Sequence, residues 1–545
     1  MQKLNTLALP SDTPLIKTRL LSLLSHRHIL RFISAMWFTA AYNSVFISKL
    51  TTAVNVSAIL LLLLLTWLII TLLTPGRLFK PMLIVLIFSS AVVQYYSSNF
   101  GVMFDAGMLQ NVLETDIHEV KDLLSFKFAS YFAVFALLPT LVVWQMPNLK
   151  LNRCLRVQRY LLIILVNIAL IGSLALTSYQ SLSGYFRVNK EQRYYATPLN
   201  IVAAVNSQLK KHLATPVKEF TRIASNVTFV PFSAKPTVFI LVLGETARAD
   251  HFTINGYQRD TTPNLSKLPI VNFAQVSSCG TATAHSVPCM FSWMNKADYD
   301  ENIAKNSENL VDIVKRAGFD VLWRDNDNGC KDVCNRVTTE NLYQSANIHC
   351  EDGCPDEVLL EHLPNLLQRQ KNLFIVLHQQ GSHGPAYYRR SHGQQVVFAP
   401  ACQDETFATC NQQEIINAYD NSLVATDDLL GKLVTTLAAM PNVNTGLWYV
   451  SDHGESLGEN GVYLHGLPYS LAPDAQTHVP MLFWLSNNYL HDAQLNLDCL
   501  HKTAAQATSH DALFGSVLGL LSIQVTTNKD LTDLITPCRS TYAQN

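Results

Sequence analysis

The sequence predicts two parts of unlike fold, a domain of five membrane-spanning helices followed by an α/β domain outside the cytoplasm. The 545-residue chain is 48% hydrophobic and only 15% charged, and its long apolar runs concentrate before residue 180. Beyond that point, buried-strand patterns alternate with helical ones, and ten of the eleven cysteines occur there. We therefore expect a transmembrane domain over 1–180, an interfacial bridging helix and linker over 181–235, and a globular domain over 236–545.

Five apolar stretches have about the ~20 residues that a helix needs to cross a bilayer. They are 29–48, 56–73, 80–96, 127–146 and 160–178. The first is the weakest, because it contains Arg31 and Asn43. Lys and Arg gather before the first stretch and in alternate loops, and such residues stay on the cytoplasmic side. The N-terminus is therefore expected inside, and everything beyond residue 180 outside.

The loop between the third and fourth stretches repeats apolar residues at helical spacing. This predicts an amphipathic helix near 106–122 on the outer membrane surface. Asn111, Thr115 and Glu119 fall four residues apart and share one side of that helix. Two interpretations stay open for this side, a solvated face or a lip that meets a lipid head group.

Eight of the ten cysteines after the membrane domain form close pairs in the sequence, which is typical of disulfides in an oxidising compartment, and Cys499 and Cys538 are left over, their pairing staying open. A zinc site built from the four cysteines between 330 and 354 is the less favoured alternative, because zinc-binding pairs usually have shorter spacing. The expected bridges are Cys279 with Cys289, Cys330 with Cys334, Cys350 with Cys354, Cys402 with Cys410, and Cys499 with Cys538.

The globular part reads as an α/β sheet with helices on both faces, because its strands are continuous apolar runs. Strands are expected at 237–245, 321–323, 372–377, 446–450 and 479–485. Helices are expected at 309–317, 356–368, 414–439 and 509–521, and the short bridging helix at 200–213. Ligands bind beyond the carboxyl ends of such strands. Glu245 closes the first strand, His383 follows the third, and Asp452 and His453 follow the fourth.

The segment CGTATAHSVPC, residues 279–289, places small and hydroxyl residues between two cysteines. A hydroxyl there can attack phosphorus if a base or a metal activates it. Glu245, Asp452 and His453 supply three zinc ligands, and Thr283 can take the fourth position as an alkoxide. The alternative is a disulfide-closed loop without chemistry. Structural or solvated roles are assigned to the remaining histidines of interest: His285, His378, His478 and His510.

Six motifs stand out together: Gly244–Asp250, the 279–289 loop, Trp323–Asn326 with Cys330-Lys331, Gly381–Pro385, Asn417–Asn421, and Ser451–Glu459 with His465. In these motifs the chain resembles the phosphoethanolamine transferases, inner-membrane enzymes that modify lipid A or the lipopolysaccharide core and include the mobile colistin-resistance proteins. The resemblance covers nearly the whole chain. It implies a sulfatase/alkaline-phosphatase-like fold for a periplasmic catalytic domain.

The resemblance also implies roles for residues. Those that match the family's zinc ligands are Glu245, Thr283, Asp452 and His453, with Thr283 also the nucleophile; one zinc ion is bound tightly and a second is left open. Those that match positions binding phosphoethanolamine or a second metal are Lys331, His383 and His465. Those that match positions near the ethanolamine head group are Asn111, Thr115 and Glu119. The chain departs from the family at 326–329, which leaves a role for Asn328 open, and at Asp332, where Gly is usual.

The reaction implied is transfer of phosphoethanolamine from phosphatidylethanolamine to a lipid A phosphate through a phospho-threonine, which lowers surface negative charge and gives polymyxin resistance. Lys331, with protonated His383 or His465, is expected to stabilise charge at phosphorus. Alternatives are Kdo or heptose of the core as acceptors, a phosphoglycerol transferase, a hydrolytic sulfatase, or a non-catalytic sensor. We expect a membrane-embedded monomer, and the net charge of −1 gives no reason to expect a nucleic acid partner.

Overall fold

The computed structural model describes residues 27–115, 120–121, 123–145, 153–213, 219–342, 355–368, 371–527 and 530–540. The chain forms two compact units, Met1–Ala106 with Phe126–Ser207, and Gly107–Ser125 with Gln208–Asn545. We call them the membrane unit and the soluble unit. The segment Gly107–Ser125 therefore belongs to the soluble unit, although the chain on both sides of it belongs to the membrane unit. The expected bridge at 181–235 is divided at Ser207.

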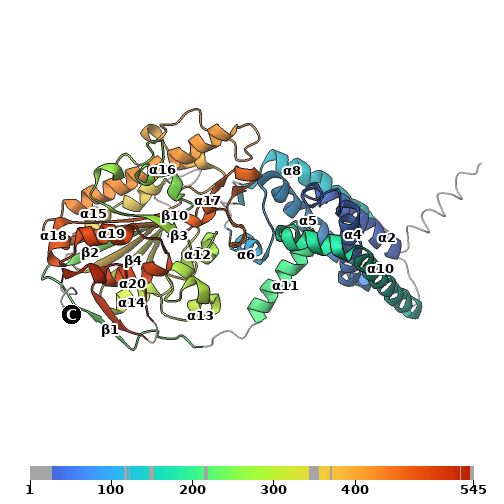
Figure 1. Cartoon of the computed structure of the whole chain (residues 1–545), viewed down its shortest axis with the longest axis horizontal. Coiled ribbons are helices and arrows are strands. Elements are labelled where there is room, and N and C mark those ends of the chain that lie inside the picture. Colours follow the sequence, from blue (N-terminus) through green and yellow to red (C-terminus); the bar gives the residue numbers. More distant parts are fainter. Residues whose placement is uncertain are drawn as a thin grey trace, which may run out of the picture. The chain divides into compact units, whose positions relative to one another are not determined.

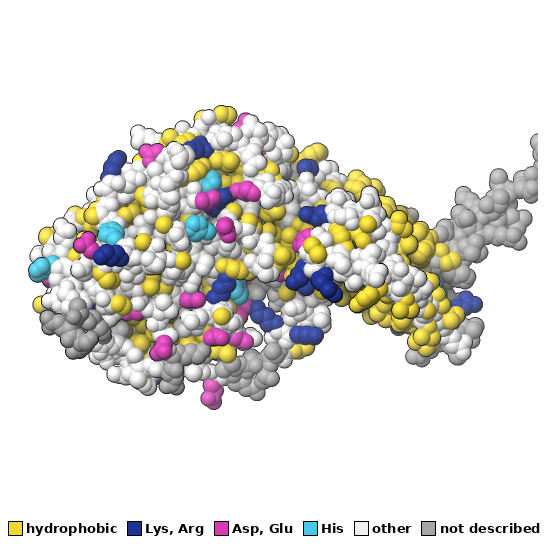
Figure 2. Space-filling model, viewed as in Figure 1, with side chains coloured by type: hydrophobic (Ala, Val, Ile, Leu, Met, Phe, Trp, Pro, Cys, Tyr) yellow, Lys and Arg dark blue, Asp and Glu magenta, His cyan; other side chains and the backbone are white. Residues whose placement is uncertain are grey.

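The membrane unit is helical (Figure 1). Its elements are α2 Arg27–Ala41, α3 Ser44–Ser48, α4 Asn55–Leu73, η1 Gly76–Leu78, α5 Phe79–Phe100, α8 Phe126–Phe132, η2 Ala133–Leu137, α9 Leu138–Gln145, α10 Arg153–Val188 and η3 Lys190–Tyr194. Four helices among the described residues are long and apolar enough to cross a bilayer: Asn55–Leu73, Gly76–Phe100, Phe126–Gln145 and Val157–Val188. Hydrophobic side chains lie exposed over these helices (Figure 2), Leu161, Leu162 and Leu165 of α10 among them.

The first predicted span, 29–48, is interrupted at Asn43, so the described residues contain four uninterrupted spans rather than five. The Asn43 amide donates to Phe38 O at 2.9 Å and to Thr197 O at 2.7 Å, and Asn43 Oδ1 accepts from Thr197 N at 2.8 Å. Arg31 is buried, and its Nε donates to Thr74 Oγ1 at 3.1 Å. The two polar residues that weaken the apolar pattern are thus paired inside the unit, which is what burial of polar groups requires.

The soluble unit contains an eight-stranded sheet in the order β11-β3-β10-β7-β2-β6-β4-β5. The strands are β2 Thr237–Gly244, β3 Val271–Ser277, β4 Asp320–Asp325, β5 Thr338–Asn341, β6 Leu373–His378, β7 Asn444–Ser451, β10 His478–Leu485 and β11 Thr508–Ser509. All five predicted strands are present. Strand β10 runs antiparallel to β7 and β3, so the sheet is mixed rather than wholly parallel.

Helices cover both faces of this sheet, with α16 on one face and α14 and α20 on the other (Figure 1). The helices wholly within the soluble unit are α12 Thr283–Met290, α13 Glu301–Lys305, α14 Leu310–Arg316, η8 Asp356–Leu360, α15 Leu363–Leu367, α16 Gln412–Ala438, α17 Asp474–Thr477, α18 Asn487–Asp492, α19 Leu497–Ala504 and α20 Asp511–Leu520. Two more, α6 Ala106–Glu114 and α11 Leu199–Leu213, begin in the membrane unit and end in the soluble unit. Two small sheets pair β1 Asn226–Phe229 with β12 Ile523–Thr526, and β8 Ser456–Leu457 with β9 Tyr463–Leu464. The predicted helix at 356–368 is divided at His362, whose φ is 54°.

The core forms because the central strands are buried on both faces. Every residue of β2, β6 and β7 is buried. Since successive side chains of a strand point to opposite faces, such a run requires cover on both sides. Phe239, Leu241 and Trp448 pack in one cluster with Leu513 and Phe514 of α20. The rigid sheet that results fixes the positions of the residues that follow its strands.

Four of the five expected disulfides are formed in the structure: Cys279–Cys289, Cys330–Cys334, Cys402–Cys410 and Cys499–Cys538. Cys350 and Cys354 lie outside the described residues.

Candidate active site

Two neighbouring parallel strands bring the predicted acidic residues together. Gly244 at the end of β2 is paired in register with Ser451 at the end of β7. Glu245 and Asp452 therefore follow directly at the same edge of the sheet, and Asp452 N donates to Gly244 O at 3.0 Å. Glu245, Asp452 and His453 are all fully buried.

Thr283 is the first residue of α12, and its hydroxyl reaches this edge. Thr283 Oγ1 lies 3.1 Å from Glu245 Oε2, 3.2 Å from Glu245 Oε1 and 3.3 Å from His453 Nε2. Ser286 Oγ donates to Asp452 O at 2.6 Å and thereby holds α12 against the same loop. The helix N-terminus favours negative charge, so an oxygen placed there is favoured as an anion or as a phosphate ester.

The donor set fits a zinc ion. His453 Nδ1 lies 3.0 Å from Gly454 O, which places its proton on Nδ1 and leaves a lone pair on Nε2. That nitrogen is 3.3 Å from both Glu245 Oε1 and Asp452 Oδ2, and one ligand atom of each residue lies within 4.8 Å of the others. Asp452 Oδ2 is buried and accepts no hydrogen bond from the described residues. Two carboxylates, an imidazole and a hydroxyl are ligands that zinc accepts.

Electrostatics also favour a cation here. Burial, and then the charges of Asp452 and Asp327, raise the pKa of Glu245 well above its usual value. Buried carboxylates that repel one another need a cation or a proton between them. Burial and the nearby charges of His465 and Arg390 lower the pKa of His383 well below 6.5. A neutral His383 is therefore favoured at pH 7, rather than the protonated form considered from the sequence.

A small cavity of about 50 Å³ opens beside Thr283. Five of the residues expected to bind substrate line it: Asn111, Thr115, Lys331, His383 and His465. Glu119, the remaining member of that set, lies outside the described residues. Glu114 and Asn328 also line the cavity, and sequence reasoning gave no role to either.

The side chains around the cavity are held by buried partners. His465 Nδ1 lies 2.8 Å from Glu455 Oε2, and Tyr387 Oη donates to Glu455 Oε1 at 2.6 Å. Glu455 is itself fully buried. Lys331 Nζ donates to Asn328 O at 3.2 Å. The imidazole of His465 and the ammonium of Lys331 are thus oriented before any substrate binds.

Helix α6 is tied to the loop that carries Lys331 through α13. Gln110 Nε2 donates to Glu301 Oε1 at 3.1 Å, and Lys211 pairs with the same carboxylate. Lys305 Nζ lies 3.1 Å from Glu301 Oε1 and 3.1 Å from Asp332 Oδ2. Asp332 has φ 71°, a region that favours Gly, and it pairs with Lys305.

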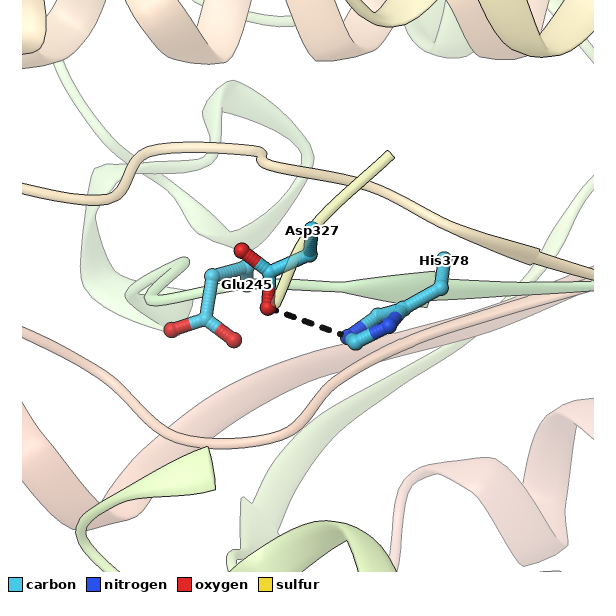
Figure 3. Close-up of side chains that lie close together, drawn as sticks. All are labelled: Glu245, Asp327 and His378. Carbon is cyan, nitrogen blue, oxygen red and sulfur yellow. Dashed lines mark ion pairs between the residues drawn. The ribbon is translucent and has the colours of Figure 1, made fainter. Parts of the chain in front are cut away.

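Sequence reasoning missed a second group of ligand-type residues. Glu245, Asp327 and His378 also present one ligand atom each within 4.8 Å of one another, and they lie together in Figure 3. The sequence signal for this group is a pair of aspartates at one strand end: Asp325 is the last residue of β4, and Asp327 follows it. His510 stands at the N-cap position of α20 without a side-chain cap hydrogen bond, and its Nδ1 accepts from Cys279 N at 3.1 Å.

The two parts of the chain match two different protein families. Residues 62–213 match the family described as phosphoethanolamine transferase EptA/EptB, and residues 237–523 match the sulfatase family. Phosphoethanolamine transferase EptA of Salmonella typhimurium is 39% identical over 464 residues, which cover 84% of this chain and 85% of that protein. Phosphatidylethanolamine transferase Mcr-1 of Escherichia coli is 36% identical over 526 residues, 92% of this chain and 96% of that protein.

A solved structure agrees over both parts. The integral membrane protein lipooligosaccharide phosphoethanolamine transferase A (EptA) from Neisseria meningitidis superposes with a TM-score of 0.89 at 32% identity. The match covers 94% of this chain and 98% of that chain. The likeness therefore includes the membrane helices as well as the sheet whose strand ends carry the candidate site.

Proposed function

Because the chain belongs to the phosphoethanolamine transferase family, we propose that it transfers phosphoethanolamine from phosphatidylethanolamine to a lipid A phosphate at the periplasmic face of the bacterial inner membrane. The name of the Escherichia coli relative contains phosphatidylethanolamine, which we take as the donor, and that of the Neisseria meningitidis structure contains lipooligosaccharide, which we take as the class of acceptor. The product carries an added ammonium group, so the cell surface becomes less negative and binds polymyxins less well.

The residues proposed to hold a zinc ion are Glu245, Thr283, Asp452 and His453. When bound, zinc lowers the pKa of a coordinated hydroxyl and neutralises charge on a phosphate. The support is geometric: the Nε2 lone pair of His453, the unpartnered Asp452 Oδ2 and Glu245 face one another beside Thr283 Oγ1.

Thr283 is proposed to be the nucleophile. In the first step the bond from Thr283 Oγ1 to phosphorus forms, the bond from phosphorus to the glycerol oxygen breaks, and diacylglycerol leaves with a proton. In the second step an oxygen of the lipid A phosphate attacks the same phosphorus and Thr283 leaves. The Thr283 hydroxyl donates to Glu245, so its proton points away from the attacked phosphorus and towards a carboxylate that can accept it. Lys331 donates N–H groups to the phosphate oxygens, a contribution of about 2.7–4 kcal/mol if it resembles a donor in an oxyanion hole.

The side of α6 that faces the cavity is proposed to receive the ethanolamine head group. Asn111 and Thr115 are half-buried and line the cavity with Glu114. A carboxylate and two neutral acceptors suit an ammonium group, because each can accept one of its N–H bonds. His383 and His465, which line the same cavity, are left for the phosphate and the acceptor.

The proposal depends most on the convergence of Thr283 Oγ1 with Glu245 and His453. The test is mass spectrometry of lipid A from polymyxin-sensitive cells that express the chain, the Thr283→Ala variant or neither. We expect phosphoethanolamine on lipid A only with the unaltered chain, and equal amounts of both proteins in the membrane. Modified lipid A in cells expressing Thr283→Ala refutes the nucleophile assignment.

Lipid analysis of the same cells also distinguishes the alternative acceptors and donors. Phosphoethanolamine found on Kdo or heptose instead of the lipid A phosphates would move the acceptor to the core. Incorporation of label from phosphatidylglycerol rather than from phosphatidylethanolamine would replace the donor and make the chain a phosphoglycerol transferase.

A further inference from the structure

A second cluster of ligand-type side chains lies on the other side of Glu245. Strands β2, β6 and β4 are adjacent in the sheet, and Glu245, His378 and Asp327 end or follow them. Register pairs His378 with Leu243 of β2 and with Asp325 of β4. All three side chains are buried, with exposed fractions of 0%, 0% and 4%. Figure 3 shows the Asp327 carboxylate turned towards the His378 ring, with Glu245 beside it.

His378 is arranged as a metal ligand. Its Nδ1 lies 3.0 Å from Asp325 Oδ2, and that oxygen also accepts from Trp323 Nε1 at 2.8 Å. A carboxylate that accepts from Nδ1 leaves the lone pair on Nε2, which is the carboxylate–histidine–metal arrangement. His378 Nε2 is buried, makes no hydrogen bond within the described part of the chain, and faces Asp327 Oδ2 at 3.6 Å.

Asp325 also positions the third ligand. Its Oδ1 accepts from Asp327 N at 3.0 Å and from Gly329 N at 3.2 Å. One buried carboxylate therefore fixes both the ring of His378 and the turn that carries Asp327. The two ligands are set by the same side chain rather than by chance proximity.

Charge gives an independent argument. Glu245, Asp325, Asp327 and Asp452 are four buried carboxylates gathered at one end of the sheet. A single dication beside Thr283 neutralises two of their four charges. Buried charges are paired or coordinate metals, so a cation beside Asp327 and His378 would offset the remaining negative charge.

A protonated His378 is the rival source of that charge. Burial opposes the proton, but the charges of Asp325, Asp327 and Glu245 outweigh it and raise the pKa of His378 to about 9. The distance of 3.6 Å from Nε2 to Asp327 Oδ2 is too long for a good hydrogen bond, however. It leaves a gap between two facing ligand atoms.

We propose that Glu245, Asp327 and His378 bind a second divalent cation, with Glu245 shared between it and the cation beside Thr283. Two carboxylates and one imidazole suit Zn²⁺ or Mn²⁺. The inference rests on the proposed function only through Glu245. It assigns a ligand role to His378, which sequence reasoning treated as a strand-end residue.

The test is the metal content of the full-length protein in detergent, loaded with Zn²⁺ or with Mn²⁺ and dialysed. Asp327→Asn keeps the size of the side chain and removes its charge, and His378→Gln removes the imidazole. The matched control is Asp320→Asn, an exposed aspartate at the opposite end of the same strand. We expect two cations per chain in the unaltered protein and the control, and one in each of the other two variants. In the Mn²⁺-loaded samples, electron paramagnetic resonance should show coupled Mn²⁺ ions only in the unaltered protein and in the Asp320→Asn control.

Equal metal content in the unaltered protein and both site variants overturns the proposal, whether the number is one or two. If Asp327→Asn does not fold, His378→Gln decides alone. Failure of the transferase proposal is recognised separately, because lipid A from cells expressing the unaltered chain would then carry no phosphoethanolamine while the cation count stayed at two.

Discussion

Glu455 offers a sharp test of how the cavity beside Thr283 works. Its carboxylate accepts from His465 Nδ1 at 2.8 Å and from Tyr387 Oη at 2.6 Å, and within the described part of the chain it forms no hydrogen bond to Thr283 or to the proposed zinc ligands. Glu455→Gln keeps the shape of the side chain and one acceptor oxygen. What the variant loses is the negative charge in the bond to His465.

The expected magnitude follows from that single change. A hydrogen bond to a charged group contributes about 1.5–3 kcal/mol and a neutral one about 0.5–1.5 kcal/mol, so the loss is about 1–1.5 kcal/mol. Because 1.36 kcal/mol is a factor of ten in rate, kcat/KM for phosphoethanolamine transfer should fall roughly 5–12-fold. The fall should be seen at unchanged zinc content, since Glu455 is not a ligand in the proposed site.

The assay is transfer from labelled phosphatidylethanolamine to lipid A by the purified full-length protein, with zinc measured in the same preparation. Glu459→Gln is the control, because Glu459 lies on the same loop but pairs with Arg248 at 2.5 Å and is 40% exposed. An unchanged kcat/KM in Glu455→Gln, or a fall that only follows lost zinc, would show that orientation of His465 does not matter to the reaction.

Two further predictions concern the packing around the site. Gly466 has φ +85°, and an added Cβ would lie 2.9 Å from Met108 Cε and 3.1 Å from Asn111 Nδ2. Gly466→Ala should therefore push the Met108 and Asn111 side chains of α6 aside and raise KM for phosphatidylethanolamine several-fold more than it lowers kcat; an equal effect on both would contradict this. Burial lowers the pKa of His510 to about 4, and protonation would put a second N–H against Cys279 N. Between pH 6.5 and 4 the folded state binds fewer protons than the unfolded state. Lowering the pH from 6.5 to 4 should therefore lower the free energy of unfolding by on the order of 3 kcal/mol. Thermal unfolding followed by near-ultraviolet circular dichroism should show that loss, and His510→Gln should flatten it.

The sequence predicts those residues of the site that directly follow a predicted strand. Glu245 and Asp452 each come directly after a continuous apolar run, and parallel strands bring such residues to one edge. Thr283 is found by composition, since no core element needs a run of small and hydroxyl residues between two cysteines. These inferences require only that the strands be parallel, which β2 and β7 are.

The Asp327–His378 pair could not be found in this way. His378 does end a strand, as expected, but its role depends on β6 lying between β2 and β4 in the sheet. It depends further on Asp325 accepting from Nδ1, which is a side-chain orientation that no spacing encodes. The break of the first span at Asn43 could not be predicted for a similar reason, because Thr197, the hydrogen-bond partner of Asn43, is 154 residues away.

Glu301 explains how two segments so distant in sequence can form one head-group site. Its carboxylate accepts from Gln110 of α6 and pairs with Lys305, and Lys305 in turn pairs with Asp332 beside Lys331. Lys211 and then Lys305 lower the pKa of Glu301, although burial opposes this, so the carboxylate stays ionised and the network stays intact at neutral pH. The α6 side chains proposed to bind the ammonium and the lysine proposed to bind the phosphate are thereby held from one α13 carboxylate. A substrate that carries both charges at a fixed separation would be selected by that spacing, and a phosphate without an amine would gain only half of the contacts.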